Sequence, residues 1–290
     1  MSILRVGYAP VFFVGFLAAA LVLSDGGTRP LPLVGLLAAA ILVSMLVERI
    51  LPYEPRFNGS HGDRGRDLAH AIVNEAANTA SVLAMPLVVA LVPAHGGWPD
   101  GWPVVAQLAL AIVIADVGIT LAHWASHRVE LLWRFHAVHH SVERLYGFNG
   151  LMKHPFHQAF EVVAATTPLV VLGLPQPVAW LLTFAVAIQL LLQHSNVDMR
   201  VGPLAFVWAV APPHRWHHVA SARDGDVNFG LFTCFWDHVL GTFRPADPSR
   251  RFAPGDFGVA GRPHYPRAYA AQIVEPFRVG SVDGRNEVTS

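Results

Sequence analysis

Long apolar runs alternate with short polar segments along the first two thirds of the chain. Crossing the roughly 30 Å hydrocarbon core of a bilayer takes about 20 helical residues. Two of the runs reach that length, and two more reach it when flanking residues are included. These four runs are Tyr8–Leu23, Leu31–Val47, Ile72–Val92 and Val104–Ala122. The pattern therefore predicts about four transmembrane helices.

Two further apolar runs form a closely spaced pair. Val162–Leu174 and Val178–Leu192 are separated only by a Pro-Gln-Pro sequence that begins at Pro175. Each run is short for a full crossing, and the prolines favour a turn between them. We expect a tilted, half-deep helical hairpin whose two ends return to the same side of the membrane.

Composition agrees with a membrane protein. Of the 290 residues, 53% are hydrophobic and 14% are charged, whereas a soluble domain carries about 25% charged residues. The formal net charge is zero, so there is no basic field to indicate nucleic acid as a partner. The single cysteine, Cys234, excludes an internal disulfide framework and cysteine-based metal motifs. The predicted fold class is an all-α integral membrane protein.

The distribution of Lys and Arg orients the chain. The segment between the second and third runs carries four arginines, and Pro93–Pro103 carries no basic residue. Cytoplasmic connections are enriched in basic residues, so the N-terminus, the Glu48–Asp67 loop and everything after Ala122 except the hairpin are predicted to be cytoplasmic. The Ala-, Arg- and Gly-rich composition favours a bacterial inner membrane.

Eight histidines fall into three clusters in which neighbours are mostly three or four residues apart. Residues with these spacings share one face of a helix, so each cluster is expected to direct its imidazoles toward one point. The clusters lie at or beyond the cytoplasmic ends of the predicted spans. They are His123 and His127, then His136, His139 and His140, and finally His214, His217 and His218.

Imidazole is the usual protein ligand for iron, zinc and copper. Eight such ligands are too many for one four-coordinate ion and suit two ions. The two His-x-x-His-His blocks repeat one geometry, which favours two similar half-sites that face each other across a pair of metals. We therefore expect a cytosolic helical cap that holds a histidine-rich dimetal site.

Four polar residues are candidates to support the metal ligands. Asp116 lies two helical turns before His123 and is expected to accept a hydrogen bond from an imidazole N–H, since a charged residue inside a span is usually functional. Glu143, one turn beyond the second cluster, and Asp237 are further candidate acceptors. The amide of Asn228 is expected to orient a metal-bound water.

Two more histidines are candidate additional ligands. His194 follows the hairpin at its cytosolic end and is the best ninth ligand, whereas His154, in a Lys-His-Pro sequence, is weaker. His238 is weaker still. The isolated histidines are expected to be structural or exposed, and they are His61, His70, His95, His157 and His264.

The order His-x3-His, His-x2-His-His, His-x2-His-His resembles the fatty acid hydroxylase superfamily, which includes sterol desaturases and lipid hydroxylases. The resemblance extends from about Asp116 to Phe243. One departure is that His157 and Gln158 stand where a Leu-Glu pair is expected after His-Pro. The landmarks that carry the resemblance are Trp133–Ser141, Lys153–Pro155, His194–Asn196, Asn228–Gly230 and Trp236–Thr242.

The resemblance implies a cytosolic-facing centre of two Fe ions that uses O₂ to oxidise a C–H bond of a lipid or sterol-like substrate. Zinc is a possible substitute in purified protein. Hydroxylation, desaturation and ether cleavage stay open. No Gly-x-Gly-x-x-Gly fingerprint for a flavin or nicotinamide is present, so electrons are expected from an external ferredoxin or cytochrome b5-like protein with its reductase.

Other functions compete with this interpretation. A zinc-dependent membrane hydrolase would also use histidine, but the His123–His127 pair lacks the Glu of a His-Glu-x-x-His motif. A metal transporter or metal-binding protein would place its ligands at the bilayer midplane. A carboxylate-bridged di-iron bundle would need Glu-x-x-His pairs, which are absent from the clusters.

The predicted organisation has three parts. Residues 1–115 form the N-terminal transmembrane helices, residues 116–244 form the catalytic region that resembles the hydroxylases, and residues 245–290 form an irregular C-terminal tail.

Overall fold

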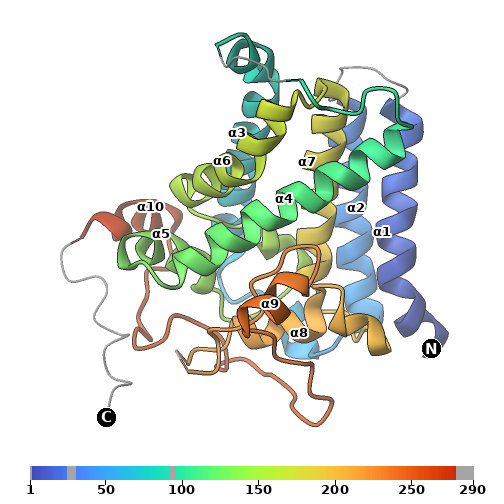
Figure 1. Ribbon diagram of the computed structural model, residues 1–290. Helices are drawn as coiled ribbons and strands as arrows, with labels where there is room; N and C mark the ends of the chain where they lie inside the picture. Colours follow the sequence, from blue (N-terminus) through green and yellow to red (C-terminus); the bar gives the residue numbers. More distant parts are fainter. Residues whose placement is uncertain (1, 25–30, 92–95, 222, 279–290) are drawn as a thin grey trace.

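The computed structural model describes residues 2–24, 31–91, 96–221 and 223–278 (Figure 1). Over these ranges the regular elements are all helices, and only isolated β-bridges occur. Parts of three predicted segments lie outside the described residues. They are Val92 of the third apolar run, the start of the Pro93–Pro103 connection with His95, and residues 279–290 of the predicted tail. The chain is an all-α integral membrane protein.

Five helices in the described part of the chain are long and apolar enough to span a membrane. The first four correspond to the four predicted runs, and the fifth is the second helix of the predicted hairpin. They are α1 (Ser2–Ser24), α2 (Leu31–Ile50), α3 (Arg64–Leu91), α4 (Val104–Ser126) and α7 (Gln176–Gln193).

The hairpin consists of α6 (Pro155–Leu172) and α7. Gly173 ends α6 with φ 87°, a left-handed conformation that favours glycine, and its N–H bonds back to the last turn. In α7, 78% of the apolar window is buried inside the protein, against 17–39% in the other four candidate spans. The helix expected to lie half-deep is therefore the central helix of the bundle.

The other helices surround α7. In Figure 1, α1 and α2 lie on one side of it, α3 and α6 on the other, and α4 crosses in front. The crossing of α4 and α6 is unusually close, because a Cβ added at Gly118 would lie only 2.3 Å from the carbonyl oxygen of Ala164. Glycine at this position lets the two backbones pack directly.

The N-terminal end of α1 lies at the same end of the molecule as the histidine-bearing helices (Figure 1). The N–H of Arg200 donates to the carbonyl of Arg5 (2.9 Å), and Arg5 forms a 3.0 Å ion pair with Asp198. At the end of α2, Glu48 accepts hydrogen bonds from the N–H groups of Gly147 and Asn196. The segment that follows α7 is thus tied to the ends of both first helices.

Short helices and loops form a cap at this end. The α-helices of the cap are α5 (Glu130–His140), α8 (Ala211–His217), α9 (Phe235–Leu240) and α10 (Tyr269–Val274). The 3₁₀ helices of the chain are Pro55–Asn58, Gly147–Leu151, Gly202–Phe206 and Glu275–Phe277.

The segment predicted to be an irregular tail contains α10, which packs against the body of the protein. The side chain of Gln272 in α10 is fully buried. Its Oε1 lies 2.9 Å from Nε2 of His70, and its Nε2 donates to the hydroxyl of Ser141 at 2.8 Å. These buried polar contacts hold α10 against the rest of the protein.

Candidate metal centre

Nine histidines converge in two groups, and each is at most 7% exposed. Within each group, one ring nitrogen per histidine lies within 4.8 Å of the corresponding nitrogens of the other members. The five-histidine group is His123, His127, His136, His140 and His217. The four-histidine group is His139, His194, His214 and His218. Both groups could hold a metal ion, and the two together contain all eight clustered histidines and His194.

Each His-x-x-His-His block contributes to both groups. The i,i+4 pair of α5, His136 and His140, belongs to the five-histidine group, whereas His139 between them belongs to the other. The block at α8 is divided the other way. Its i,i+4 pair, His214 and His218, belongs to the four-histidine group, whereas His217 belongs to the five-histidine group. Each block therefore connects the two groups, in contrast to the expectation that the two blocks would face each other as half-sites.

The imidazoles approach one another through their Nε2 atoms. In the five-histidine group, Nε2 of His123 lies 3.0 Å from Nε2 of His136 and 2.8 Å from that of His217. In the four-histidine group, Nε2 of His194 lies 3.1 Å from Nε2 of both His139 and His218. Nitrogen atoms from separate helices thus meet in two compact sets.

Hydrogen bonds between Nδ1 and a backbone carbonyl oxygen fix the tautomer of four of these imidazoles. A carbonyl oxygen only accepts, so each of these Nδ1 atoms carries the proton and each Nε2 presents a lone pair. Lone pairs that face each other at about 3 Å repel unless a cation lies between them, which is the arrangement of a metal site. The bonds are His123 to Phe229 (2.9 Å), His139 to Met152 (2.8 Å), His194 to Leu190 (3.0 Å) and His217 to Val227 (2.8 Å).

Burial keeps these imidazoles neutral. Desolvation lowers the pKa of His217 to about 4 and that of His194 to about 3, and it holds the pKa values of His136 and His139 well below the usual value. Neutral imidazole is the form that binds a metal ion. At neutral pH the donor set is therefore ready to accept metal without losing protons.

The two predicted acidic acceptors Asp116 and Asp237 hold a loop instead of bonding directly to an imidazole. Asp116 accepts from the N–H groups of Phe232 (2.7 Å) and Thr233 (3.2 Å) and from the Thr233 hydroxyl. Asp237 accepts from the N–H groups of Phe229 (2.7 Å) and Gly230 (2.8 Å). The loop presents the Phe229 carbonyl to His123, so both carboxylates act on the site through the backbone.

Asn228 belongs to the same loop and adopts a positive φ of 57°. Its amide nitrogen donates to the carbonyls of Pro213 and Arg244, and its oxygen accepts from the N–H of Arg244. These contacts connect the third histidine cluster to the irregular segment after α9. The structure gives Asn228 a role in shaping the backbone, and its amide is already engaged by protein groups.

Two predicted site residues are not brought to the histidine groups. Glu143 forms a surface ion pair with Arg267. His154 is the N-cap of α6, where its Nδ1 accepts from the N–H of Phe156 (3.1 Å) and its Nε2 lies 3.2 Å from the Ile273 carbonyl. The prediction that His154 is an additional ligand is therefore corrected: the side chain caps a helix, and both of its nitrogens are engaged elsewhere.

The remaining histidines in the described part of the chain are also outside both groups. His238 lies against the carbonyl of Phe206 at 2.9 Å, and His70 lies between the Lys153 carbonyl and Gln272. His157 is closer to the centre, because its ring centroid is 4.3 Å from that of His136 and its Nε2 lies 3.2 Å from the Ser126 hydroxyl.

Sequence reasoning missed three charged residues beside the histidines. Asp226 lies 3.2 Å from Nδ1 of His127 and also pairs with Arg128. Lys153 and Glu161 form a buried ion pair that lines a small cavity against both histidine groups. Asp226 is about 100 residues away from its histidine in the sequence, so no local spacing indicates the contact. The position of Glu161 close after the His-Pro sequence was the one available signal.

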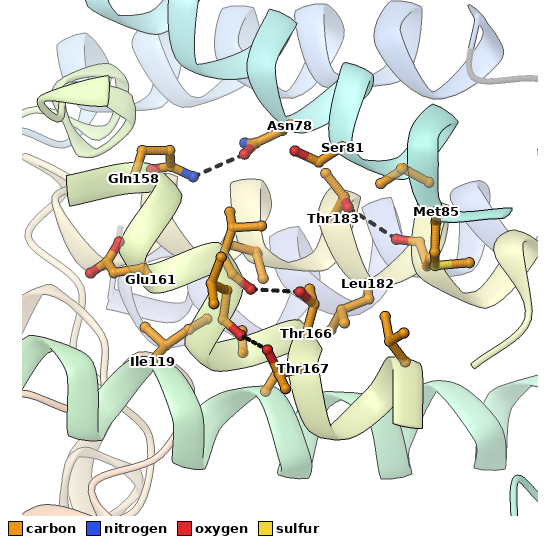
Figure 2. Close-up of a pocket in the computed structure, with 18 of the residues that line it drawn as sticks. Asn78, Ser81, Met85, Ile119, Gln158, Glu161, Thr166, Thr167, Leu182 and Thr183 are labelled. Atoms are coloured by element: carbon orange, nitrogen blue, oxygen red, sulfur yellow. Dashed lines mark hydrogen bonds between the residues drawn. The ribbon is translucent and has the colours of Figure 1, made fainter. Parts of the chain in front are cut away.

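A larger cavity of about 510 Å³ lies between α3, α4, α6 and α7 (Figure 2). It shares five lining residues with the small cavity at the histidines, so the two cavities are neighbours. The shared residues are Ile119, Lys153, Glu161, Leu190 and Leu231. Most of the remaining lining is apolar. A predominantly apolar space of this size that ends at a polar centre is typical of a ligand site.

Comparison with known proteins agrees with this site. The sequence profile of the fatty acid hydroxylase family matches residues 108–242. Ornithine lipid hydroxylase OlsE of Rhizobium tropici is 37% identical, over 84% of this chain and 74% of that protein. The chain belongs to the fatty acid hydroxylase superfamily.

More distant relatives cover a smaller part of the chain. Alkylglycerol monooxygenase of Danio rerio is 29% identical over 51% of this chain, and that of Homo sapiens is 28% identical over 46%. The matched segments span about a third of those longer proteins. No solved structure gives a significant match. The named relatives are lipid hydroxylases or monooxygenases, so the chain is an oxidoreductase of the lipid hydroxylase type.

Proposed function

We propose that this protein is a membrane-bound di-iron oxygenase that hydroxylates a membrane lipid. The observation that carries the proposal is the convergence of nine buried histidines in two groups at the end of a mostly apolar cavity. Two neighbouring groups of imidazole nitrogens fit two metal ions. The proposed ligands are the eight clustered histidines together with His194.

Iron would supply the chemistry that no side chain possesses, which is the reductive activation of O₂. Hydroxylation consumes the lipid R–H, one O₂, two electrons and two protons, and it yields R–OH and one water. The two electrons come from an external one-electron carrier of the ferredoxin or cytochrome b5 type. The protein supplies the donor set, the neutral state of the imidazoles and an apolar channel for the substrate.

The proposed substrate is a lipid that enters the large cavity from the bilayer. The cavity lies among helices that are apolar enough to span the membrane, and lipid chains match its apolar lining. The relatives are named for ornithine lipid and for alkylglycerols, and the more similar of them favours hydroxylation of an acylated membrane lipid. A zinc hydrolase would need only one of the two histidine groups.

The proposed location is a bacterial inner membrane, with the N-terminus and the metal centre on the cytoplasmic side. The basic connections support this orientation, and the N-terminal end of α1 is tied to the segment beside the histidines. Labelling of single cysteines placed at Ser60 and at Asp100 in intact cells tests it. We expect labelling by a membrane-impermeant reagent at position 100 and protection at position 60.

Elemental analysis and Mössbauer spectroscopy of protein grown on iron-57 test the metal assignment, and mass spectrometry of lipids formed under ¹⁸O₂ tests the reaction. We expect two irons per chain, a coupled ferric signal, and one labelled oxygen in a lipid product. The variant His139→Ala should lose iron and turnover, whereas His264→Ala, at an exposed position, should retain both. Stoichiometric zinc with hydrolytic activity, or full activity of His139→Ala, would contradict the proposal.

A further inference from the structure

The large cavity has a charged end and an apolar end. Along α3, the lining begins with Glu75 and Asn78 and ends with Met85 and Val88. Along α6, it begins with Gln158 and Glu161, and mostly aliphatic residues follow toward Leu172, together with two threonines. Figure 2 shows Gln158 and Glu161 at one end and Met85 toward the other. A ligand that fills this space should therefore have a polar end and an apolar body.

The charged end is the one that meets the histidines. Ile119 lies one helical turn before His123 on α4, and Leu190 lies one turn before His194 on α7. Both residues line the large cavity and the small cavity at the metal centre, as do Lys153 and Glu161. The polar end of a bound lipid, not the terminus of its acyl chain, is then adjacent to the metal ligands.

Acidic side chains outnumber basic ones at this end among the described residues. Lys153 is the only cationic side chain that lines the cavity in the described part of the chain, and it is bonded to Glu161. Glu75 adds a second carboxylate, whose hydrogen-bond partner is the amide of Asn78 at 3.5 Å. The Asn78 amide oxygen in turn accepts from Gln158 at 3.0 Å. This end of the cavity thus has two acidic side chains beside one cation, and that cation is already paired with Glu161.

We propose that Glu75 binds a primary ammonium group of the lipid substrate. A carboxyl group in an apolar surrounding is stabilised in its ionised form when a cation pairs with it, and a lipid ammonium would supply that cation at this end of the cavity. The amides of Asn78 and Gln158 lie beside Glu75 as further polar contacts. The acyl chains then extend along α3 and α6 toward Met85 and Val88.

This assignment rests on the proposed function and adds two statements to it. The substrate class is an amine-bearing lipid, and the oxidised carbon lies in the headgroup or in the chain carbons next to it. A carboxylate that merely supports helix packing would not distinguish an ammonium group from a neutral amide of nearly the same size. Discrimination between these two groups is therefore the decisive property.

The test compares ornithine lipid with its N-acetylated derivative, which has the same chains and no ammonium group. Equilibrium dissociation constants are measured in detergent micelles for the wild type, Glu75→Gln, Glu75→Asp and a control, Glu130→Gln. Glu130 is an exposed carboxylate that pairs with Arg134. Iron content and thermal unfolding of each variant establish that it is folded.

We expect the wild type and Glu130→Gln to bind the amine lipid at least ten times more tightly than the acetylated lipid. Glu75→Gln should bind the two equally, and Glu75→Asp should recover part of the difference. In turnover, Glu75→Gln should raise KM for the amine lipid about tenfold and leave kcat within twofold. Fragmentation of the product should place the new oxygen in the headgroup or the adjacent chain carbons.

Discrimination that survives in Glu75→Gln, or is absent in the wild type, would overturn the assignment of Glu75. Oxygen in the distal half of an acyl chain would overturn the orientation. The binding measurements need no turnover, so they decide on Glu75 even if no lipid is oxidised. An absence of both iron and oxidation would count against the oxygenase proposal alone.

Discussion

At the scale of single residues, the site depends on which ring nitrogen of each histidine is occupied by the protein. Backbone carbonyls take the Nδ1 proton of His123, His139, His194 and His217, so the lone pairs of four imidazoles converge at Nε2. The positions of the metal-binding nitrogens are therefore set by the backbone of loops and helix ends. A side-chain substitution elsewhere should disturb these nitrogens only if it moves one of those segments.

His194 and His154 provide a direct test of this view. We expect His194→Ala to lose metal from the four-histidine group and to abolish turnover, because it removes a nitrogen that lies 3.1 Å from two others. His154→Ala should retain both metals and lose about 1 kcal/mol of stability, as expected for a helix N-cap. Iron content and thermal unfolding of the two variants, measured side by side, provide the check. Metal loss in both would place His154 back among the ligands.

The histidine clusters were predictable because their spacing is local. Pairs such as His136 and His140 share a helical face in any context, so their convergence follows from the sequence. The contact of Asp226 with His127 depends on how distant segments pack, as does the position of Glu75 in the same cavity as Lys153, and no spacing encodes either. The role of Asp116 was missed for a related reason, since its partners Phe232 and Thr233 lie over 100 residues away.

At the scale of elements, the central position of α7 was not predictable from hydropathy. A helix surrounded by other helices and one surrounded by lipid are both apolar on every face, and the two prolines at the start of α7 favoured a half-deep hairpin. The close approach of α4 and α6 at Gly118 was equally unpredictable, because a glycine in an apolar run does not by itself indicate a helix–helix contact. Both features place the cavity directly beside the histidines.

Gly118 should therefore be intolerant of substitution. In Gly118→Ala, the new Cβ would lie 2.3 Å from the Ala164 carbonyl oxygen, so α4 and α6 must move apart. We expect a loss of about 1–3 kcal/mol of stability, as for other overpacked cores, and reduced metal content because α4 carries His123 and His127. The matched control is Gly35→Ala in α2, where a Cβ meets nothing within 4 Å. Unfolding in detergent should show a lower midpoint only for the first variant.

At the scale of the whole molecule, the metal centre joins the two parts of the fold. The ends of α4 and α7 deliver histidines from the membrane helices, and α5 and α8 deliver them from the cap. Nine imidazoles are buried at this junction, and burial lowers the pKa of cap residues such as His217. The stability of the metal-free protein should therefore depend on pH in a specific way.

The pKa values of His217 and His194 are lowered by burial to about 4 and about 3 in the folded chain, against about 6.5 when unfolded. As the pH falls below about 6.5, the unfolded chain takes up protons that the folded chain excludes, so stability falls. Each such histidine costs up to about 1.4 kcal/mol per pH unit until its folded pKa is reached. Metal-free protein should thus unfold at progressively lower temperature between pH 7 and pH 5.

The number of protons taken up on unfolding distinguishes the buried histidines from a general sensitivity to acid. His217→Gln removes one buried titrating group and should make the dependence on pH shallower, whereas His264→Ala removes an exposed one and should leave the slope unchanged. Burial raises the pKa of Asp237, an effect that opposes the histidines, so the comparison of variants, rather than the overall slope, isolates the histidine contribution. Identical slopes for the wild type and His217→Gln would mean that this imidazole is accessible to protons in the folded, metal-free protein. The cap would then be open to water without its metals, and burial would be a consequence of metal binding.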